Sequence, residues 1–87
     1  MPYVSKKKRS DINQKLVYAG RSIETPGELN YLLTRAIDQY IYSKGKSYSS
    51  INDVIGVLEC AKLELYRRIA APYEDIKIKE NGDVYTV

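Results

Sequence analysis

The stretch ETPGELNYLLTRA, Glu24 to Ala36, carries the clearest helix signal in this 87-residue chain and decides its fold. Thr25 and Glu28 form a capping box, in which each side chain accepts a hydrogen bond from the backbone N–H of the other residue. Pro26 falls at the first helical position, where its missing N–H costs nothing. Apolar residues follow at the spacing of one buried helix face: Leu29, Leu32, Leu33, Ala36, Ile37, Tyr40 and Ile41. This pattern predicts a helix over residues 26–44.

A second strong helix signal follows SYSS, where Ser50 and Asp53 form another capping pattern. The main apolar stripe of this helix contains Ile51, Val54, Ile55, Leu58, Ala61, Leu65 and Ile69. Val57 and Leu63 widen the apolar surface well beyond that stripe. A helix that is apolar over most of its circumference belongs in the centre of a domain or in an interface between chains.

Weaker signals complete the predicted set of helices. Ser10 is a candidate N-cap for a helix over residues 10–20. Apolar residues at helical spacing support it: Ile12, Leu16, Ala19 and Ile23. Pro72 is expected to end or kink the long apolar helix, which therefore covers residues 51–71.

The C-terminal sequence DIKIKENGDVYTV fits two structures. Its period-two alternation around Asn81-Gly82 slightly favours a short β-hairpin. It also fits a short helix with Pro72 in its first turn and Gly82 as its cap, followed by an extended tail. The fold class is therefore mainly α, with about three helices and either a short β-hairpin or a short helix plus tail.

Length and charge predict the organisation of the chain. A domain of this size buries only about 60% of the surface of its unfolded chain, so assembly would stabilise it. The formal net charge of the chain is +3. Lys6, Lys7, Lys8 and Arg9 contribute +4, so the charges of all other residues sum to −1. We therefore expect a basic N-terminal arm over residues 1–9 and a single helical domain over residues 10–87.

The chain lacks the residues and motifs that several common kinds of catalytic and metal site require. The chain has no histidine and one cysteine, Cys60, so it cannot build an ordinary zinc site or an internal disulfide. No nucleophile-elbow, P-loop or dinucleotide-binding motif occurs. We expect no catalytic residue, no metal and no cofactor. An enzyme that works through Glu59, Glu64 or a tyrosine is the least favoured alternative.

No apolar run reaches the roughly 20 residues of a membrane span, and a cytoplasmic location is the simplest expectation.

Tyrosine is the unusual feature of the composition, with nine tyrosines and neither phenylalanine nor tryptophan. Tyrosine offers an apolar ring with a polar tip, which suits interfaces and stacking surfaces. Tyr31, Arg35 and Tyr42 lie on one stripe of the predicted helix over residues 26–44 and are candidates for binding a second chain or a planar ligand. The simpler interpretation is a solvated face in which Arg35 pairs with Asp38.

A second candidate site lies in LYRRIAAPY and consists of Tyr66, Arg67, Arg68 and Tyr73. Arginine binds phosphate or carboxylate with two parallel hydrogen bonds, and tyrosine stacks on a base. The simpler interpretation is that these arginines form surface ion pairs with Glu64.

The phrases TPGELNYLLTRAI, SYSSINDVIGVLECAKLELYRRIAAPYED and ENGDVY resemble a family of small phage, prophage and bacterial proteins. The resemblance covers residues 25–85 together with the MPY start. It implies a small accessory protein that acts in a host cytoplasm, and it carries no catalytic or binding residue over to this chain.

Two functions are compared. The favoured one is a non-enzymatic binding protein, assembled as a homo-oligomer, that binds a host protein or a nucleotide-like small molecule. In one version it sequesters a host defence signal. The alternative is a small nucleic-acid-binding regulator that uses Lys6, Lys7, Lys8 and Arg9 as a phosphate-contacting arm.

Overall fold

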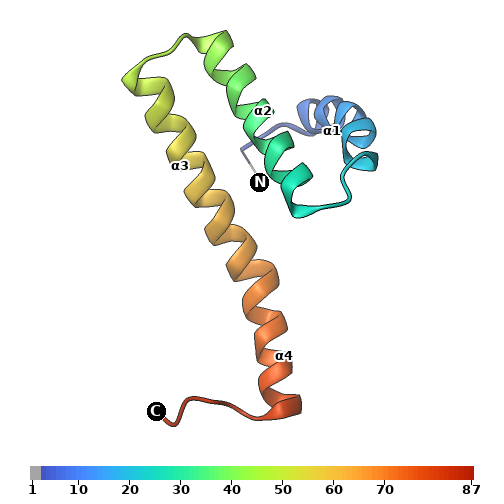
Figure 1. Cartoon of the computed structure of the whole chain (residues 1–87), viewed down its shortest axis with the longest axis vertical. Coiled ribbons are helices and arrows are strands. Elements are labelled where there is room, and N and C mark those ends of the chain that lie inside the picture. The colour runs from blue at the N-terminus through green and yellow to red at the C-terminus, as the bar shows by residue number, and fades with distance from the viewer. Residues whose placement is uncertain (1–2) are drawn as a thin grey trace. The chain divides into compact units, whose positions relative to one another are not determined.

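A computed structural model describes residues 3–87 of the chain, and these residues contain helices and no strands. The elements are α1 (Lys6–Arg21), α2 (Pro26–Lys44), α3 (Tyr48–Leu65), the π-helical turn η1 (Tyr66–Ala70) and α4 (Ala71–Asn81) (Figure 1). Because α3, η1 and α4 follow one another without a break, the described residues form three helices in all. The mainly α fold class is confirmed, and the β-hairpin alternative for the C-terminal segment is wrong.

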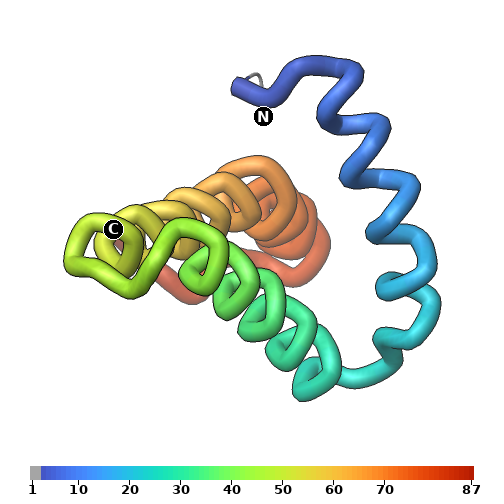
Figure 2. Tube along the Cα trace, turned by 90° about the horizontal axis from the view of Figure 1, so that it is seen from above, coloured from blue at the N-terminus to red at the C-terminus, as the bar shows by residue number. Residues whose placement is uncertain are grey.

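The chain divides into two units, residues 1–43 and 44–87. The first unit contains α1 and nearly all of α2, joined by residues 22–25. Figure 2 shows these two helices leaving that connection in different directions. The second unit contains the long helix made of α3, η1 and α4, followed by a tail without regular secondary structure.

Helix α1 begins four residues earlier than the sequence predicts. Its N-cap is Ser5, whose Oγ accepts a hydrogen bond from the Lys8 backbone N–H at 3.2 Å. Ser10, the predicted N-cap, lies inside the helix. The basic residues therefore occupy the first helical turn, a position where the helix dipole disfavours positive charge. Met1 and Pro2 of the predicted arm lie outside the described residues.

The prediction for α2 is confirmed at both ends. The Glu28 N–H donates to Thr25 Oγ1 at 3.1 Å, and Glu28 Oε1 accepts from the Thr25 N–H at 3.0 Å. The same carboxylate oxygen accepts from the Glu24 N–H at 2.7 Å. After Lys44, Gly45 adopts a φ of 90°, which stops the helix at a conformation that favours glycine.

Helix α3 starts at Tyr48 rather than Ile51, and the predicted cap by Ser50 and Asp53 is wrong. Ser47 is the N-cap, and it exchanges hydrogen bonds of 3.1 Å with Ser50 in both directions. Ser50 Oγ also donates to the Gly45 carbonyl oxygen at 2.8 Å. A serine has both a donor and an acceptor, so Ser50 can satisfy the turn before the helix as well as its cap.

Pro72 does not end the helical run but lies in the first turn of a short helix capped by Gly82, which is the helical alternative that the sequence offered for this segment. In η1 the Ala71 N–H bonds to the Tyr66 carbonyl, five residues back instead of four. Pro72 therefore falls in the first turn of α4, where a residue without an N–H is tolerated. The helix continues to Asn81 and ends at Gly82, which has a φ of 87° and whose N–H donates to the Ile78 carbonyl at 2.8 Å.

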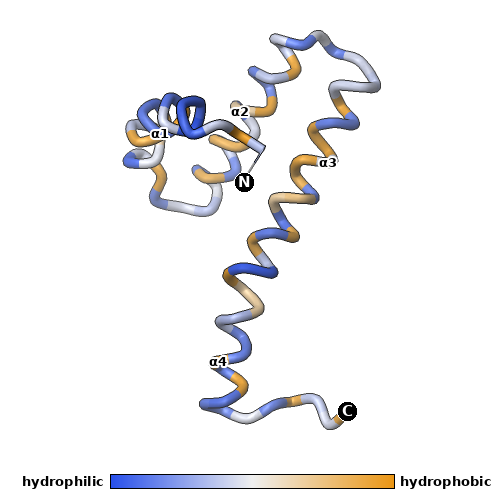
Figure 3. The backbone as a smooth tube through the Cα atoms, turned by 180° about the vertical axis from the view of Figure 1, so that it is seen from behind, coloured by the Kyte–Doolittle hydropathy of each residue, from blue (hydrophilic) through white to orange (hydrophobic). Residues whose placement is uncertain are grey.

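Burial of apolar side chains is very limited in the described part of the chain. Val54, with 9% of its surface exposed, is the one buried apolar residue there. Val57 and Leu63, which widen the apolar surface of α3, are 64% and 57% exposed. Figure 3 shows hydrophobic positions recurring along the whole of α3. No helix in residues 3–87 is both long and apolar enough to cross a bilayer.

Candidate functional site

A hollow lies where α1 ends and α2 begins, within the first unit. Its volume is about 520 Å³, which falls within the usual range of small-molecule sites, roughly 300 to 1,000 Å³. Residues from the end of α1, the connection and the first turns of α2 line it: Ala19, Ser22, Ile23, Thr25, Gly27, Glu28, Tyr31, Leu32 and Arg35. The hollow therefore combines aliphatic side chains with one aromatic ring, one carboxylate and one guanidinium group.

Two of the predicted site residues, Tyr31 and Arg35, meet at this hollow. They lie one turn apart on α2, and the Tyr31 ring is exposed. Arg35 Nη1 forms an ion pair with Asp38 Oδ2 at 2.9 Å, as the simpler interpretation expects. Because a guanidinium group carries five N–H donors, this single bond leaves further donors for a ligand. Tyr42 lies farther along α2, does not line the hollow and is 86% exposed.

The capping box controls the charge at the edge of the hollow. Hydrogen bonds from the Glu24 and Thr25 backbone N–H groups lower the pKa of the Glu28 carboxyl group. Glu28 is therefore ionised at neutral pH and already occupies the positive end of α2. A bare anion is disfavoured at that end, so a negatively charged group of a ligand would have to bind at Arg35 instead.

The second predicted cluster spans η1 and the start of α4, and most of its members have local partners. The Tyr66 hydroxyl group donates to Glu74 Oε2 at 3.1 Å, which raises the pKa of Tyr66. Arg68 Nη1 pairs with Glu64 Oε1 at 3.1 Å, as the simpler interpretation expects. Lys77 Nζ lies 5.4 Å from the centre of the Tyr73 ring.

Arg67, the remaining member of the cluster, has no ion pair in the described residues. It lies in η1 with Tyr66 and Arg68, and Tyr73 follows in α4. Three of the four side chains thus have a partner within their own helix.

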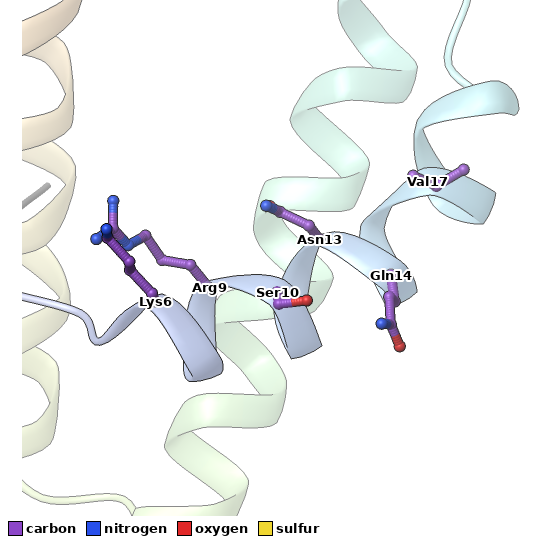
Figure 4. A pocket seen from close by; sticks show the side chains of 6 residues that line it. All are labelled: Lys6, Arg9, Ser10, Asn13, Gln14 and Val17. Carbon is purple, nitrogen blue, oxygen red and sulfur yellow. The ribbon is translucent and has the colours of Figure 1, made fainter.

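The basic residues lie in the first turn of α1. Lys6 and Arg9 line a hollow of about 460 Å³ together with polar residues and one valine: Ser10, Asn13, Gln14 and Val17. Figure 4 shows the Lys6 and Arg9 side chains extending to the same side of the helix. Lys7 and Lys8 belong to the same turn but do not line this hollow. Cations and amides are the groups that contact phosphates in nucleic-acid complexes.

In the described part of the chain, the acidic residues show no arrangement suited to metal binding. Residues 3–87 contain no group of three or more histidine, cysteine, aspartate or glutamate side chains placed to hold a metal ion. Glu59 and Glu64 each pair with a cation on their own helix, namely Lys62 at 3.3 Å and Arg68 at 3.1 Å. Cys60 is exposed and unbonded to another cysteine.

Sequence reasoning missed the aliphatic part of the hollow at Tyr31. Ala19, Ile23 and Leu32 line it, whereas helical spacing assigns all three to the apolar faces of their helices. The available signal was the position of Ile23, which comes just before the capping box that begins α2. A connection this short necessarily places the end of one helix beside the start of the next.

Comparison with known proteins gives one family. The family model described as "Domain of unknown function (DUF6899)" matches residues 1–84. No curated protein and no solved structure matches the chain.

Proposed function

The chain belongs to the DUF6899 family, and we propose that it is a small, non-enzymatic accessory protein that acts by binding. Its target is a host protein or a nucleotide-like small molecule, and the chain works as an oligomer. The resemblance of its motifs to phage and prophage proteins supports a role in a host cytoplasm. In that setting the protein would sequester a host signal, such as a defence nucleotide.

The hollow at Tyr31 and Arg35 is the observation that carries this proposal. A base could stack on the exposed Tyr31 ring, and the phosphate of the same ligand could take the free donors of Arg35. The adjoining aliphatic side chains of Ile23 and Leu32 suit the apolar faces of a base. The size and mixed lining of the hollow favour the nucleotide-like ligand over the host protein.

The surroundings of the carboxylates support a role in binding rather than catalysis. Glu59 and Glu64 each form an ion pair with a cation along the long helix, Lys62 and Arg68 respectively. General acid–base catalysis needs a carboxylate or another titratable group within hydrogen-bond reach of a bound substrate. Glu59 and Glu64 instead have cations as their partners.

Ligand release and calorimetry test the small-molecule version. Gently purified protein is denatured, the released small molecules are identified by mass spectrometry, and a panel of nucleotides is titrated against the intact protein. We expect Tyr31→Ala and Arg35→Ala each to weaken binding about tenfold or more, because each removes one of the proposed contacts. Tyr18→Ala is the matched control, since Tyr18 is exposed and lies outside the hollow. An empty eluate together with no heat of binding for any nucleotide would remove this version.

The basic face of α1 supports a second candidate, a nucleic-acid-binding regulator. Lys6, Arg9 and Asn13 extend to one side of α1, whereas Gln14 extends to the other (Figure 4). If α1 binds nucleic acid, the affinity for DNA or RNA should decrease steeply as the salt concentration rises. The double variant Lys6→Ala, Arg9→Ala should bind more weakly than the wild type at the same salt concentration. Absence of DNA and RNA binding at low salt would reject it.

A further inference from the structure

Gly27 lies in the first turn of α2, at a position where the backbone does not require a glycine. The glycines with positive φ in the described residues are Gly45 and Gly82, so Gly27 has an ordinary negative φ. Beyond the adjacent residues and the helix's own backbone, a Cβ added to Gly27 would meet Thr25 Oγ1 at 3.9 Å, an ordinary van der Waals distance. Because glycine destabilises a helix relative to alanine, Gly27 weakens α2 without relieving strain or a clash.

Gly27 shares one stripe of α2 with the two proposed ligand contacts. Tyr31 follows Gly27 by four residues and Arg35 follows Tyr31 by four, so the three positions lie above one another on the helix surface. All three residues line the hollow. Eight residues of α-helix rise by about 12 Å, so the stripe runs for about this distance from the start of α2 to Arg35.

The missing side chain of Gly27 affects what can lie on the Tyr31 ring. Helical side chains tilt toward the N-terminus, so an aromatic residue meets the side chain that lies four residues earlier. For Tyr31 this earlier position is Gly27, which has no side chain to place against the ring. Glu28, three residues earlier, instead turns back to the Glu24 and Thr25 N–H groups. Within the described residues of the first unit, no cation or second ring contacts the Tyr31 ring.

The charges along the stripe give its two ends different chemistry. The Glu28 carboxylate is held by the Glu24 and Thr25 N–H groups, so negative charge already occupies the turn that contains Gly27. A phosphate group is repelled beside that carboxylate, whereas an uncharged base is not. Arg35, at the other end, carries a guanidinium group that suits a phosphate. The stripe therefore favours a nucleotide-like ligand with its base near Gly27 and its phosphate near Arg35.

We propose that Gly27 is the specificity-determining residue of the hollow, because its missing side chain leaves the space in which a planar base stacks on the Tyr31 ring. The proposal rests on the proposed function and adds the orientation of the ligand to it. A larger side chain at residue 27 would pack on Tyr31 in place of the base, as aliphatic and aromatic side chains do at this spacing. Such a side chain would strengthen the helix and exclude the ligand.

Calorimetric titrations with AMP, GMP, CMP and UMP test this role in the wild type, Gly27→Ala and Gly27→Leu. We expect Gly27→Leu to weaken the tightest of the four interactions about tenfold or more, the size of effect that loss of base stacking on an aromatic ring produces. Gly27→Ala should have a smaller effect in the same direction. Thermal unfolding followed by circular dichroism should show a higher Tm for both variants, because alanine and leucine form helices better than glycine.

Gly20→Leu is the matched control. Gly20 lies in α1 without a positive φ, does not line the hollow, and has no atom within 4 Å of an added Cβ beyond the adjacent residues and the helix's own backbone. We expect Gly20→Leu to bind with wild-type affinity. If Gly27→Leu binds as tightly as the wild type, or if Gly20→Leu loses as much affinity, the role of Gly27 is wrong and the ligand site stands. A wild type that binds none of the four nucleotides would overturn this role together with the nucleotide-binding proposal.

A thiol at residue 27 gives a second measurement, in case Gly27→Leu disturbs the fold. Cys60 is the one cysteine of the chain, so Gly27→Cys in a Cys60→Ser background carries a single thiol. We expect saturation with the tightest-binding of the four nucleotides to slow the reaction of this thiol with iodoacetamide. The thiol of Gly20→Cys in the same background should react at an unchanged rate. Equal rates for Gly27→Cys with and without bound nucleotide would place the base elsewhere and overturn the proposal.

Discussion

Ser50 offers the sharpest test of the local structure, because one hydroxyl group serves both the turn before α3 and the cap of that helix. Ser50→Ala removes the acceptor of the Ser47 N–H and the donor to the Gly45 carbonyl, bonds of 3.1 and 2.8 Å. Each bond is worth about 1 kcal/mol, and alanine returns about 0.5 kcal/mol through its higher helix propensity. We expect a net loss of about 1.5 kcal/mol in the free energy of unfolding.

Urea unfolding followed by circular dichroism measures this loss. All variants are compared at one protein concentration, because association would add to the apparent stability. A loss of about 1.5 kcal/mol lowers the urea midpoint by about 1 to 1.5 M for a protein of this size. Ser49→Ala is the matched control, since Ser49 is exposed in the same helical turn and should gain slightly from alanine. If Ser50→Ala and Ser49→Ala unfold at the same urea concentration, the hydrogen bonds at Ser50 do not contribute as argued.

Two further predictions concern the helices. Gly56→Ala should raise the free energy of unfolding by up to about 1 kcal/mol, because no atom beyond the adjacent residues and the helix's own backbone lies within 4 Å of the added Cβ; a loss in the same urea assay would contradict this reasoning. The lowered pKa of Glu28 means that its ionised form stabilises the fold at neutral pH, and that this contribution disappears as the pH falls through the folded-state pKa. Wild type should therefore be more stable than Glu28→Gln at pH 7, with the difference shrinking in acid; an equal difference at both pH values would contradict the capping argument.

The sequence by itself determined the elements that depend on near neighbours. Helix α2 follows directly from Thr25, Pro26 and Glu28, whose capping interactions span only three residues, and from Gly45 at its end. The mainly α class and the wide apolar surface of α3 were likewise readable from spacing. The local ion pairs of Arg35 and Arg68 were also expected from their positions on one helix face.

Other features required the folded backbone. The C-terminal segment fitted both a hairpin and a short helix capped by Gly82, and the structure selects the helix, which the π turn joins to α3 without a break. The hollow at Tyr31 depends on how the connection brings Ile23 next to α2, which no single-helix pattern specifies. Periodicity shows which side chains share a face, whereas burial depends on what lies against that face in three dimensions.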